Sequence, residues 1–224
     1  MGADGTRTAN DMDLLARLEK LYVAVVADCL DRVGVRSNLL APHVRPLYPG
    51  ARVAGYALTV HIVEVDEAPP REQWYEGEIQ AVDSQQPGDV MVVSSTPGSY
   101  WGELLATASR VRGARGLVGD CYARDTAELI KMRYPTFVRG PLAYDSLGRI
   151  DVDGVGVPIE CAGVTVHPGD LVIGDDDGVA IVPRALAEEV IGFAEEKVAG
   201  ENTVRDRLAE GMPVAEAFRT YGVL

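Results

Sequence analysis

The sequence predicts an α/β fold, built as one domain over residues 11–224 with mixed sheets, a β-rich insert and helical segments at both ends. Strand-like and helix-like segments alternate between residues 51 and 140, which is the pattern of parallel β-α-β units. After Gly140 the apolar runs become short and are broken by Gly, Pro and Asp, as is typical of antiparallel turns. The 224 residues, 47% of them hydrophobic, are enough for one sizeable core.

The N-terminal part predicts a tail, a helix and a buried strand. Residues 1–10 predict a flexible tail, and apolar residues at helical spacing predict a helix over 11–33 that ends at Gly34. The apolar residues with this spacing are Leu14, Leu15, Leu18, Leu21, Tyr22, Val25, Val26 and Leu30. Three prolines make 39–50 a loop or sheet edge, and the nearly continuous apolar run at 51–65 predicts a buried strand.

The middle and C-terminal parts continue the alternation and then change. We expect helices at 71–82, at 103–113 and from the 120–129 stretch onward, and strands at 85–95, 114–119 and 135–140. A glycine-containing loop at 96–102 precedes the second of these helices. Within the β-rich insert, "GDDDGV" at 174–179 predicts a tight turn between two strands. From Arg184 onward the pattern predicts two helices with a break near Gly200.

Composition excludes several classes of protein. The formal net charge of -13 argues against nucleic-acid binding, which needs a basic face. Three well-separated cysteines, Cys29, Cys121 and Cys161, fit reduced thiols better than disulfides or a zinc site. The N-terminus has no apolar core of a signal peptide, and no apolar run is long enough to span a bilayer. We therefore expect a cytoplasmic protein with no membrane partner.

Charged residues crowd a predicted strand–helix junction in "LVGDCYARDTAEL". Asp125 stands at an N-cap position and Glu128 follows three residues later, which is the spacing of a capping box. Capping does not account for Arg124, because a cation beside a helix N-terminus opposes the helix dipole and needs an anionic partner. That partner is Asp120, Asp125 or a ligand.

A second junction, "PGSYWGELL", follows the preceding strand. It is either a plain turn or a helix N-terminus whose exposed amides bind an anion. Loops at the carboxyl ends of neighbouring parallel strands share one crevice, so we expect 96–103 to face 120–125. Such a crevice would offer amides and Arg124 to an anion, and the carboxylates of Glu103, Asp120 and Asp125 to a cation.

Oxygen ligands of this kind suit a hard divalent ion such as Mg²⁺. His43, His61 and His167 are scattered, and we expect surface or core positions for them, not a zinc site. GxGxxG, P-loop and GxSxG motifs are absent from the sequence, and the lack of a glycine-rich nucleotide loop argues against a methyltransferase.

A family resemblance rests on several motifs: "WGELLATA", "GARGLVGDCYARDTAEL", "VHPGDLVIGDDDGVAIVP" and "AFRTYGVL". Glu103 is followed by twenty residues and then by Arg124 and Asp125, and this spacing is similar to the signature of the class II pyruvate aldolases. These enzymes cleave 4-hydroxy-4-methyl-2-oxoglutarate and 4-carboxy-4-hydroxy-2-oxoadipate, and they share a fold with the RraA-like regulators of ribonuclease E. The resemblance therefore implies an RraA-like, swivelling β/β/α domain.

The resemblance also implies roles for residues. Asp125 would bind Mg²⁺, or Mn²⁺ or Co²⁺ in its place, and Glu103 would hold a metal-bound water where the family usually has Asp. Arg124 would bind the keto oxygen and stabilise the enolate, and Asp120 would orient Arg124. The backbone amides expected to hold the pyruvyl carboxylate are those near Gly102, Leu104 and Leu105. The C-terminal glutamates that could complete a neighbouring subunit's site are Glu195, Glu196 and Glu201.

The implied activity is that of a metal-dependent carbon–carbon lyase. It would cleave a 4-hydroxy-2-oxo dicarboxylate to pyruvate by aldol cleavage, or decarboxylate oxaloacetate, with the enolate stabilised by the cation and Arg124. Relatives are trimers or pairs of trimers, so a homotrimer or hexamer with sites at subunit boundaries is expected. The alternatives are a non-catalytic RraA-type regulator of a ribonuclease and a related lyase or hydratase that acts on a different acid.

The chain departs from the family pattern near the expected site. Cys121 and Tyr122 stand where small residues are common, and Tyr122 either narrows the pocket and binds substrate or packs in the core. The segment "EVDEAPPREQWYEGEI" replaces a Gly-Asp-Asn loop, and its Trp74, Tyr75, Glu76 and Glu78 are further pocket candidates. These departures concern the substrate more than the enolate chemistry.

Overall fold

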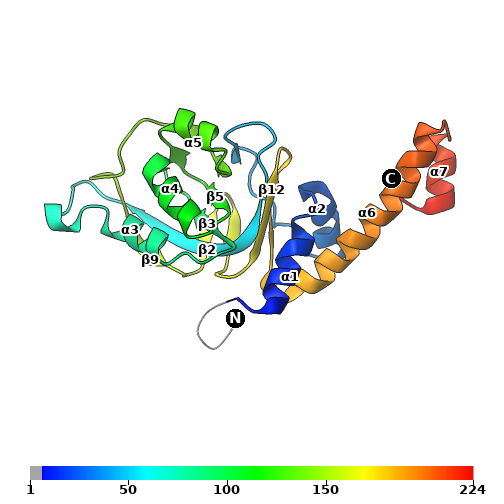
Figure 1. Ribbon diagram of the computed structural model, residues 1–224, viewed down its shortest axis with the longest axis horizontal. Coiled ribbons are helices and arrows are strands. Elements are labelled where there is room, and N and C mark those ends of the chain that lie inside the picture. Colours follow the sequence, from blue (N-terminus) through cyan, green and yellow to red (C-terminus); the bar gives the residue numbers. More distant parts are fainter. Residues whose placement is uncertain (1–6, 224) are drawn as a thin grey trace.

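The computed structural model of the chain describes residues 7–223, and Figure 1 shows its arrangement. The helices are α1 (Ala9–Leu18), α2 (Val23–Arg32), α3 (Glu76–Asp83), α4 (Glu103–Val111), α5 (Thr126–Met132), α6 (Ala187–Ala209) and α7 (Val214–Tyr221), with 3₁₀ turns η1 (Arg71–Gln73) and η2 (Arg184–Leu186). The strands are β1 (Arg45–Pro46), β2 (Val53–Glu64), β3 (Asp89–Val93), β4 (Ser99–Trp101), β5 (Gly116–Gly119), β6 (Tyr122–Ala123), β7 (Thr136–Val138), β8 (Gly140–Pro141), β9 (Ile150–Val155), β10 (Ile159–Cys161), β11 (Val164–Val166), β12 (Leu171–Asp175) and β13 (Gly178–Val182).

The main sheet is mixed, as the sequence predicts. Over residues 7–223 it holds eight strands in the order β1-β7-β5-β3-β2-β12-β13, with β9 paired to β2 beyond this path. The β2, β3, β5 and β7 ladders are parallel, whereas β1, β9, β12 and β13 pair antiparallel. Arg45 donates from Nη1 to the carbonyls of Asp176 and Asp177 at 3.3 and 3.0 Å, which ties β1 to the β12–β13 turn and nearly closes the sheet.

Alternate side chains of β3 enter different core clusters, because successive residues of a strand point to opposite faces. Met91 and Val93 join the cluster under α3, α4 and α5, while Val90 and Val92 join the cluster that includes the β10–β11 hairpin. A third cluster packs α1, α2 and α6 against β12 and β13, beside the sheet (Figure 1). Helices, sheet and hairpin thus form the β/β/α layers expected for the chain.

The prediction of one continuous N-terminal helix is wrong. Two helices replace the single helix at 11–33: α1 starts at Ala9 and ends at Leu18, and α2 starts at Val23. Both carry apolar faces into one cluster, so the spacing of apolar residues looks uniform although the backbone turns between them. The first amide of α2, that of Val23, donates to Asp175 at 2.8 Å, a tertiary contact that local sequence does not reveal. Of the predicted tail, residues 1–6 lie outside the described residues, and Thr8 caps α1 with a capping box.

The predicted break near Gly200 is also wrong. Gly200 lies inside α6, where a glycine costs only about 1 kcal/mol relative to alanine, and the break falls at Glu210–Pro213 instead. Pro213 cannot continue a helix, and Gly211 adopts φ +97°, so these two residues set the boundary. The predicted helix at 71–82 is likewise divided, because Tyr75 between η1 and α3 has φ 58°.

Expectations for the strands and the turn are confirmed. The apolar run at 51–65 forms the buried β2, the β12–β13 hairpin turns within "GDDDGV", and β10–β11 is antiparallel. All three cysteines, each within the described residues, are buried and free. No helix in the described part of the chain combines the length and apolar character that crossing a bilayer requires.

Candidate functional site

The two strand–helix junctions meet, as their positions in the sequence predict. A small parallel sheet, β4-β6-β8, holds them together: Ser99 pairs with Tyr122, and Trp101 with Ala123. The amide of Arg124 donates to the carbonyl of Trp101 at 2.8 Å, so the start of α5 lies against the start of α4.

Asp125 does not cap its own helix, so the capping-box interpretation of Asp125 and Glu128 is wrong. Asp125 has left-handed backbone geometry with φ 54°, and its side chain makes no capping hydrogen bond to α5. Its Oδ2 instead accepts from the amide of Glu103 at 3.3 Å, at the N-terminus of the neighbouring α4. The uncommon backbone geometry thus directs the carboxylate away from its own helix and toward the start of α4.

Gly102 makes this approach possible. A Cβ atom at Gly102 would lie 2.8 Å from Asp125 Oδ2 and 3.3 Å from Arg124 Cγ, closer than side-chain atoms normally come. The glycine therefore has a packing role at the junction: it lets the Arg124–Asp125 pair lie directly over the N-terminus of α4.

Arg124 has two anionic neighbours. Its Nε lies 3.7 Å from Asp125 Oδ2, and its Nη1 lies 3.4 Å from Asp145 Oδ2, with all three side chains about two-fifths exposed. Asp145 also accepts from the hydroxyl of Tyr75 at 3.0 Å. Although burial raises the pKa of Asp145, hydrogen bonds from the Leu147 amide, Tyr75 and Arg124 together with the charge of Arg124 lower it on balance. Asp145 is therefore the anion that orients Arg124.

Asp120 was expected in that position, and the structure corrects this contact. Asp120 is buried and pairs with Arg139, His43 and Ser95, with His43 Nε2 at 2.7 Å from Oδ1. Burial alone would raise the pKa of Asp120, but hydrogen bonds from these three side chains lower it to about 2. Asp120 thus stabilises the end of the strand behind the junction. The catalytic role expected for Asp120 stays a prediction.

One cavity of about 330 Å³ contains most of the expected site. Its lining residues are Tyr75, Glu78, Ile79, Ser99, Tyr100, Trp101, Gly102, Leu104, Leu105, Arg124, Asp125, Asp145 and Ser146. Gly102, Leu104, Leu105, Arg124 and Asp125 were predicted, and the N-terminal amides of α4 lie among them. Figure 1 shows α3, α4 and α5 gathered on the same side of the sheet.

Three residues of the predicted site lie outside this lining, namely Asp120, Tyr122 and Glu103, and so do the pocket candidates Trp74 and Glu76. Tyr122 is on β6, where the guanidinium of Arg139 lies 5.9 Å from its ring centroid, so its expected contact with substrate gains no support. The carboxylate of Glu103 accepts from the Thr107 hydroxyl at 2.8 Å on its own helix. Its role as the holder of a metal-bound water stays a prediction, for which the side chain would have to leave Thr107.

Sequence reasoning missed Asp145 and Ser146 altogether and named Tyr75 and Glu78 only as part of an unusual segment. Glu78 is 4% exposed; burial raises its pKa, with a hydrogen bond from Ser146 opposing the shift. No local motif marks Asp145, which lies in the connection between β8 and β9. The available signal was a glutamate on the buried face of an amphipathic helix. It could not be used from sequence alone, because the sequence did not show which face of α3 is buried.

The C-terminal glutamates lie on α6. Glu195 accepts from Arg17 of the same chain at 2.9 Å, and Glu201 accepts from the hydroxyl of Tyr22. Glu196 is exposed. Their expected role at a neighbouring subunit stays a prediction.

The donor set fits a hard divalent cation with a mostly aqueous shell. Within residues 7–223, no group of three or more His, Cys, Asp or Glu side chains is arranged to hold a metal by itself. Mg²⁺ commonly binds through one or two carboxylates and keeps several waters, which matches the half-exposed Asp125 beside an open cavity.

Comparison with known proteins places this site in context. A family model described as "RraA-like: Aldolase/RraA" matches residues 23–181. A protein of Halalkalibacterium halodurans named "Putative 4-hydroxy-4-methyl-2-oxoglutarate aldolase" is 26% identical over 93% of this chain and 94% of its own length.

Solved structures share the fold. An uncharacterized protein from Pseudomonas syringae covers 92% of this chain and 96% of its own, with 29% identity and a TM-score of 0.81. RraAS2 of Streptomyces coelicolor, described as an unusual member of the RNase ES inhibitor RraA protein family, covers 88% of this chain and 98% of its own, with 29% identity and a TM-score of 0.78. The expected fold is therefore confirmed.

Proposed function

The chain belongs to the RraA-like family of aldolases and regulators, and on that premise we propose that it is a divalent-metal-dependent carbon–carbon lyase acting on a 2-oxo acid. The observation that carries the proposal is one cavity that holds the Arg124 guanidinium, the Asp125 carboxylate and the N-terminus of α4 together. A regulator that acts only through protein contacts has no need of this combination.

The residues of the cavity suit an enolate. The α4 N-terminus, near Gly102 and Leu104, would bind the carboxylate of the substrate, because the first amides of a helix lack intrahelical partners and its dipole favours an anion. Arg124, held by Asp145, would donate to the keto oxygen and stabilise the negative charge that develops there. A divalent cation bound through Asp125 would supply a further positive charge at the same oxygen.

Two reactions lead to the same enolate. In aldol cleavage of a 4-hydroxy-2-oxo acid, the 4-hydroxyl loses its proton, the C3–C4 bond breaks, and its electron pair forms the enolate. In decarboxylation of oxaloacetate the electron pair comes from the bond to the departing CO₂, so no base is needed at that step. Protonation of C3 then gives pyruvate in both cases.

The test is release of pyruvate from oxaloacetate and from 4-hydroxy-4-methyl-2-oxoglutarate, followed by coupling to lactate dehydrogenase. The assay would be run with Mg²⁺, with Mn²⁺ and with EDTA, on the wild type and on Asp125→Ala. Glu128→Ala is the matched control, because it removes an exposed carboxylate from the start of α5 without touching the cavity.

We expect metal-dependent turnover that falls by about 10²-fold or more in Asp125→Ala and is unchanged in Glu128→Ala. Absence of turnover, together with absence of metal binding by calorimetry, would overturn the lyase and favour a non-catalytic binding protein.

A further inference from the structure

The part of the cavity beyond the expected enolate site is acidic. Among the described residues that line the cavity, Arg124 is the one cation, whereas Glu78, Asp125 and Asp145 are carboxylic acids. We call Tyr75, Glu78, Asp145 and Ser146 the acidic wall; they come from α3, the residue that precedes it and the connection that precedes β9.

The positive charge of Arg124 is already balanced by neighbouring carboxylates, so Arg124 is not free to pair with a second carboxylate of the substrate. Its guanidinium already lies within 4 Å of Asp125 and Asp145, and the proposed function assigns it to the keto oxygen. Asp125 and Asp145 offset Arg124 and one of the two charges of a divalent cation, so the occupied cavity would carry at most one positive charge before substrate enters, whatever the protonation state of Glu78. One carboxylate, held by the α4 amides, is then the charge that the cavity accommodates.

The acidic wall offers acceptors and neutral hydroxyl groups. The Tyr75 hydroxyl donates to Asp145, and Ser146 is hydrogen-bonded to Glu78. Glu78 carries no positive charge in either protonation state, and its side chain is almost fully buried. A second carboxylate placed here would lose its water without gaining a cation, whereas a hydroxyl group would donate to the wall. Apolar neighbours such as Ile79 and Leu105 suit the carbon chain that bears such hydroxyls.

We propose that the substrate is a 2-oxo acid with a single carboxylate, whose portion beyond the cleaved bond is uncharged and hydroxylated. This rests on the proposed function, since it takes the pyruvyl half to lie at Arg124 and α4. Cleavage breaks the C3–C4 bond, leaves its electron pair on the pyruvate enolate, and turns C4 with its deprotonated oxygen into the carbonyl of a hydroxyaldehyde.

The first arm of the test isolates the enolate half of the site. Metal-dependent exchange of the C3 hydrogens of pyruvate with D₂O, measured by ¹H NMR, requires no distal group. Absence of exchange would overturn the proposed function and this inference with it. Exchange is the expected result, and the second arm then tests the inference alone.

The second arm compares two substrates that differ at one group. Cleavage of 4,5-dihydroxy-2-oxopentanoate yields glycolaldehyde, and cleavage of 4-hydroxy-2-oxoglutarate yields glyoxylate, so a CH₂OH group replaces a carboxylate. Pyruvate is quantified by NMR, because glyoxylate interferes with dehydrogenase coupling. We expect kcat/KM to favour the hydroxylated monocarboxylate by about tenfold or more.

Variants of the acidic wall test whether its carboxylates cause the preference for the monocarboxylate. Glu78→Gln and Asp145→Asn each remove a carboxylate at nearly constant volume, and each should raise the relative kcat/KM of the dicarboxylate by about 3–10-fold. Asp145 is partly exposed, so its variant remains informative if the buried Glu78→Gln fails to fold. Glu76→Gln is the matched control, because Glu76 is exposed on the same helix and absent from the lining.

Equal use of the two substrates, or preference for the dicarboxylate, would overturn the inference while pyruvate exchange persists. It would also be overturned if the ratio in Glu78→Gln and Asp145→Asn did not differ from that in Glu76→Gln.

Discussion

Gly102 sets how closely Asp125 approaches α4, and this contact can be tested directly. In Gly102→Ala the new methyl group would meet Asp125 Oδ2 at 2.8 Å and displace the carboxylate. Because displacements near 1 Å at a reacting centre are costly, we expect metal-dependent turnover to fall by about 10–100-fold, with a weaker apparent metal affinity by calorimetry. Gly192→Ala is the control: a methyl group on this α6 glycine meets no atom within 4 Å, so activity should not change. Full activity of Gly102→Ala would contradict the role assigned to this glycine.

Asp120 should govern part of the acid sensitivity of the fold. Its pKa of about 2 lies below the value of about 3.9 expected in the unfolded chain, so its stabilisation is present above pH 4 and is lost as the pH falls toward 2. The free energy of unfolding of Asp120→Asn should therefore fall below that of the wild type by about 2 kcal/mol at pH 7, and this difference should shrink between pH 4 and 2. Urea unfolding at several pH values measures it.

Asp153→Asn provides the comparison for that experiment. Asp153 pairs with His61 on an exposed surface, where such pairs contribute about 0–1 kcal/mol. A stability gap for Asp120→Asn that stayed constant with pH would contradict the linkage argument.

At the residue scale, the sequence predicted which charged residues belong to the site better than it predicted the residues that contact them. Arg124 and Asp125 were identifiable because a cation beside a helix N-terminus needs an explanation, and the structure does bring both to the cavity. Asp145 was not identifiable, because nothing within a few residues of it shows that its connection brings it beside Arg124 and Tyr75. Asp120 was assigned to the wrong arginine for the same reason: Arg139, its actual partner, lies on the next strand connection.

At the element scale, α3 and β9 fit closely at Gly77. A Cβ atom at Gly77 would lie 2.5 Å from Cβ of Val152 and 3.0 Å from its carbonyl oxygen. Gly77→Ala would otherwise favour the helix, by about 0.5–1 kcal/mol. Because of this contact we expect destabilisation instead, by about 1–3 kcal/mol, measured by chemical unfolding. Val152→Gly removes that Cβ atom, so the double variant should be destabilised by less than the sum of the two single variants; stabilisation by Gly77→Ala alone would contradict the packing argument.

The longer strands of the main sheet were predicted more reliably than helix boundaries, for a physical reason, whereas the short strands β4 and β6 were not predicted. The parallel strands are buried on both faces and read as continuous apolar runs, as β3 does with five buried residues in a row. The division between α1 and α2 depends instead on Asp175, more than 150 residues away, which binds the first amide of α2. The break predicted at Gly200 was wrong for the opposite reason. Glycine is a local helix-breaking signal, but its cost is small beside the many helical residues of α6 on either side of it.

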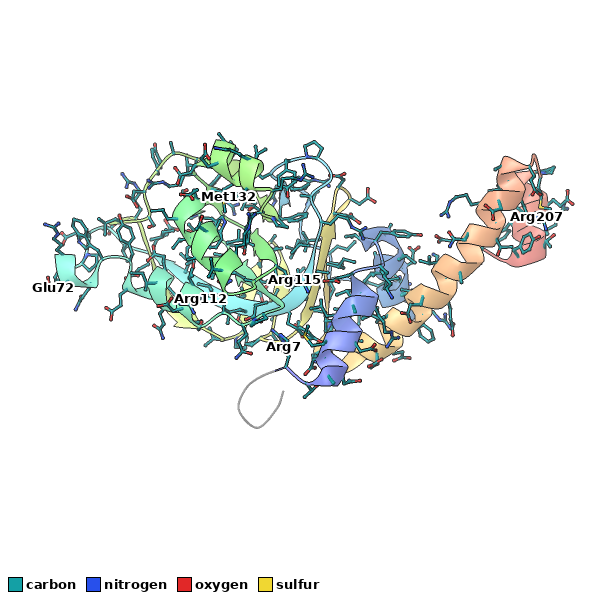
Figure 2. The ribbon with its side chains drawn as sticks, in the orientation of Figure 1. Arg7, Glu72, Arg112, Arg115, Met132 and Arg207 are labelled. Atoms are coloured by element: carbon teal, nitrogen blue, oxygen red, sulfur yellow. The ribbon has the colours of Figure 1, made fainter. Side chains whose placement is uncertain are left out.

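At the scale of the whole molecule, the C-terminal arm predicts assembly. Figure 1 shows α6 leaving the body of the protein and carrying α7 with it, and Figure 2 labels Arg207 on this arm and Glu72 at the opposite end of the long axis. Val214 and Phe218 are more than half exposed on α7. We expect a homotrimer or hexamer in sedimentation velocity experiments, with the arm covered by a neighbouring copy.

Phe218→Glu should weaken that assembly, because it places a charge on the apolar side of α7. Arg219→Ser, at the next and also exposed position, is the matched control and should leave the sedimentation coefficient unchanged. A monomer that retains full lyase activity would contradict both the assembly and the expected sites at subunit boundaries.

The cavity is formed by two sets of segments that are separate in the chain, and this separation bears on how the proposed activity could diversify. Arg124, Asp125 and the α4 amides lie at strand ends of the small β4-β6-β8 sheet. The acidic wall comes instead from the connection 142–149 and from 65–80, a connection that runs into the first turn of α3. Connections tolerate insertion and replacement far better than paired strands do. Exchange of these two segments between homologues should therefore transfer substrate preference as a unit. A combinatorial library confined to them would sample preferences for other acids and leave Arg124, Asp125 and the α4 amides unchanged.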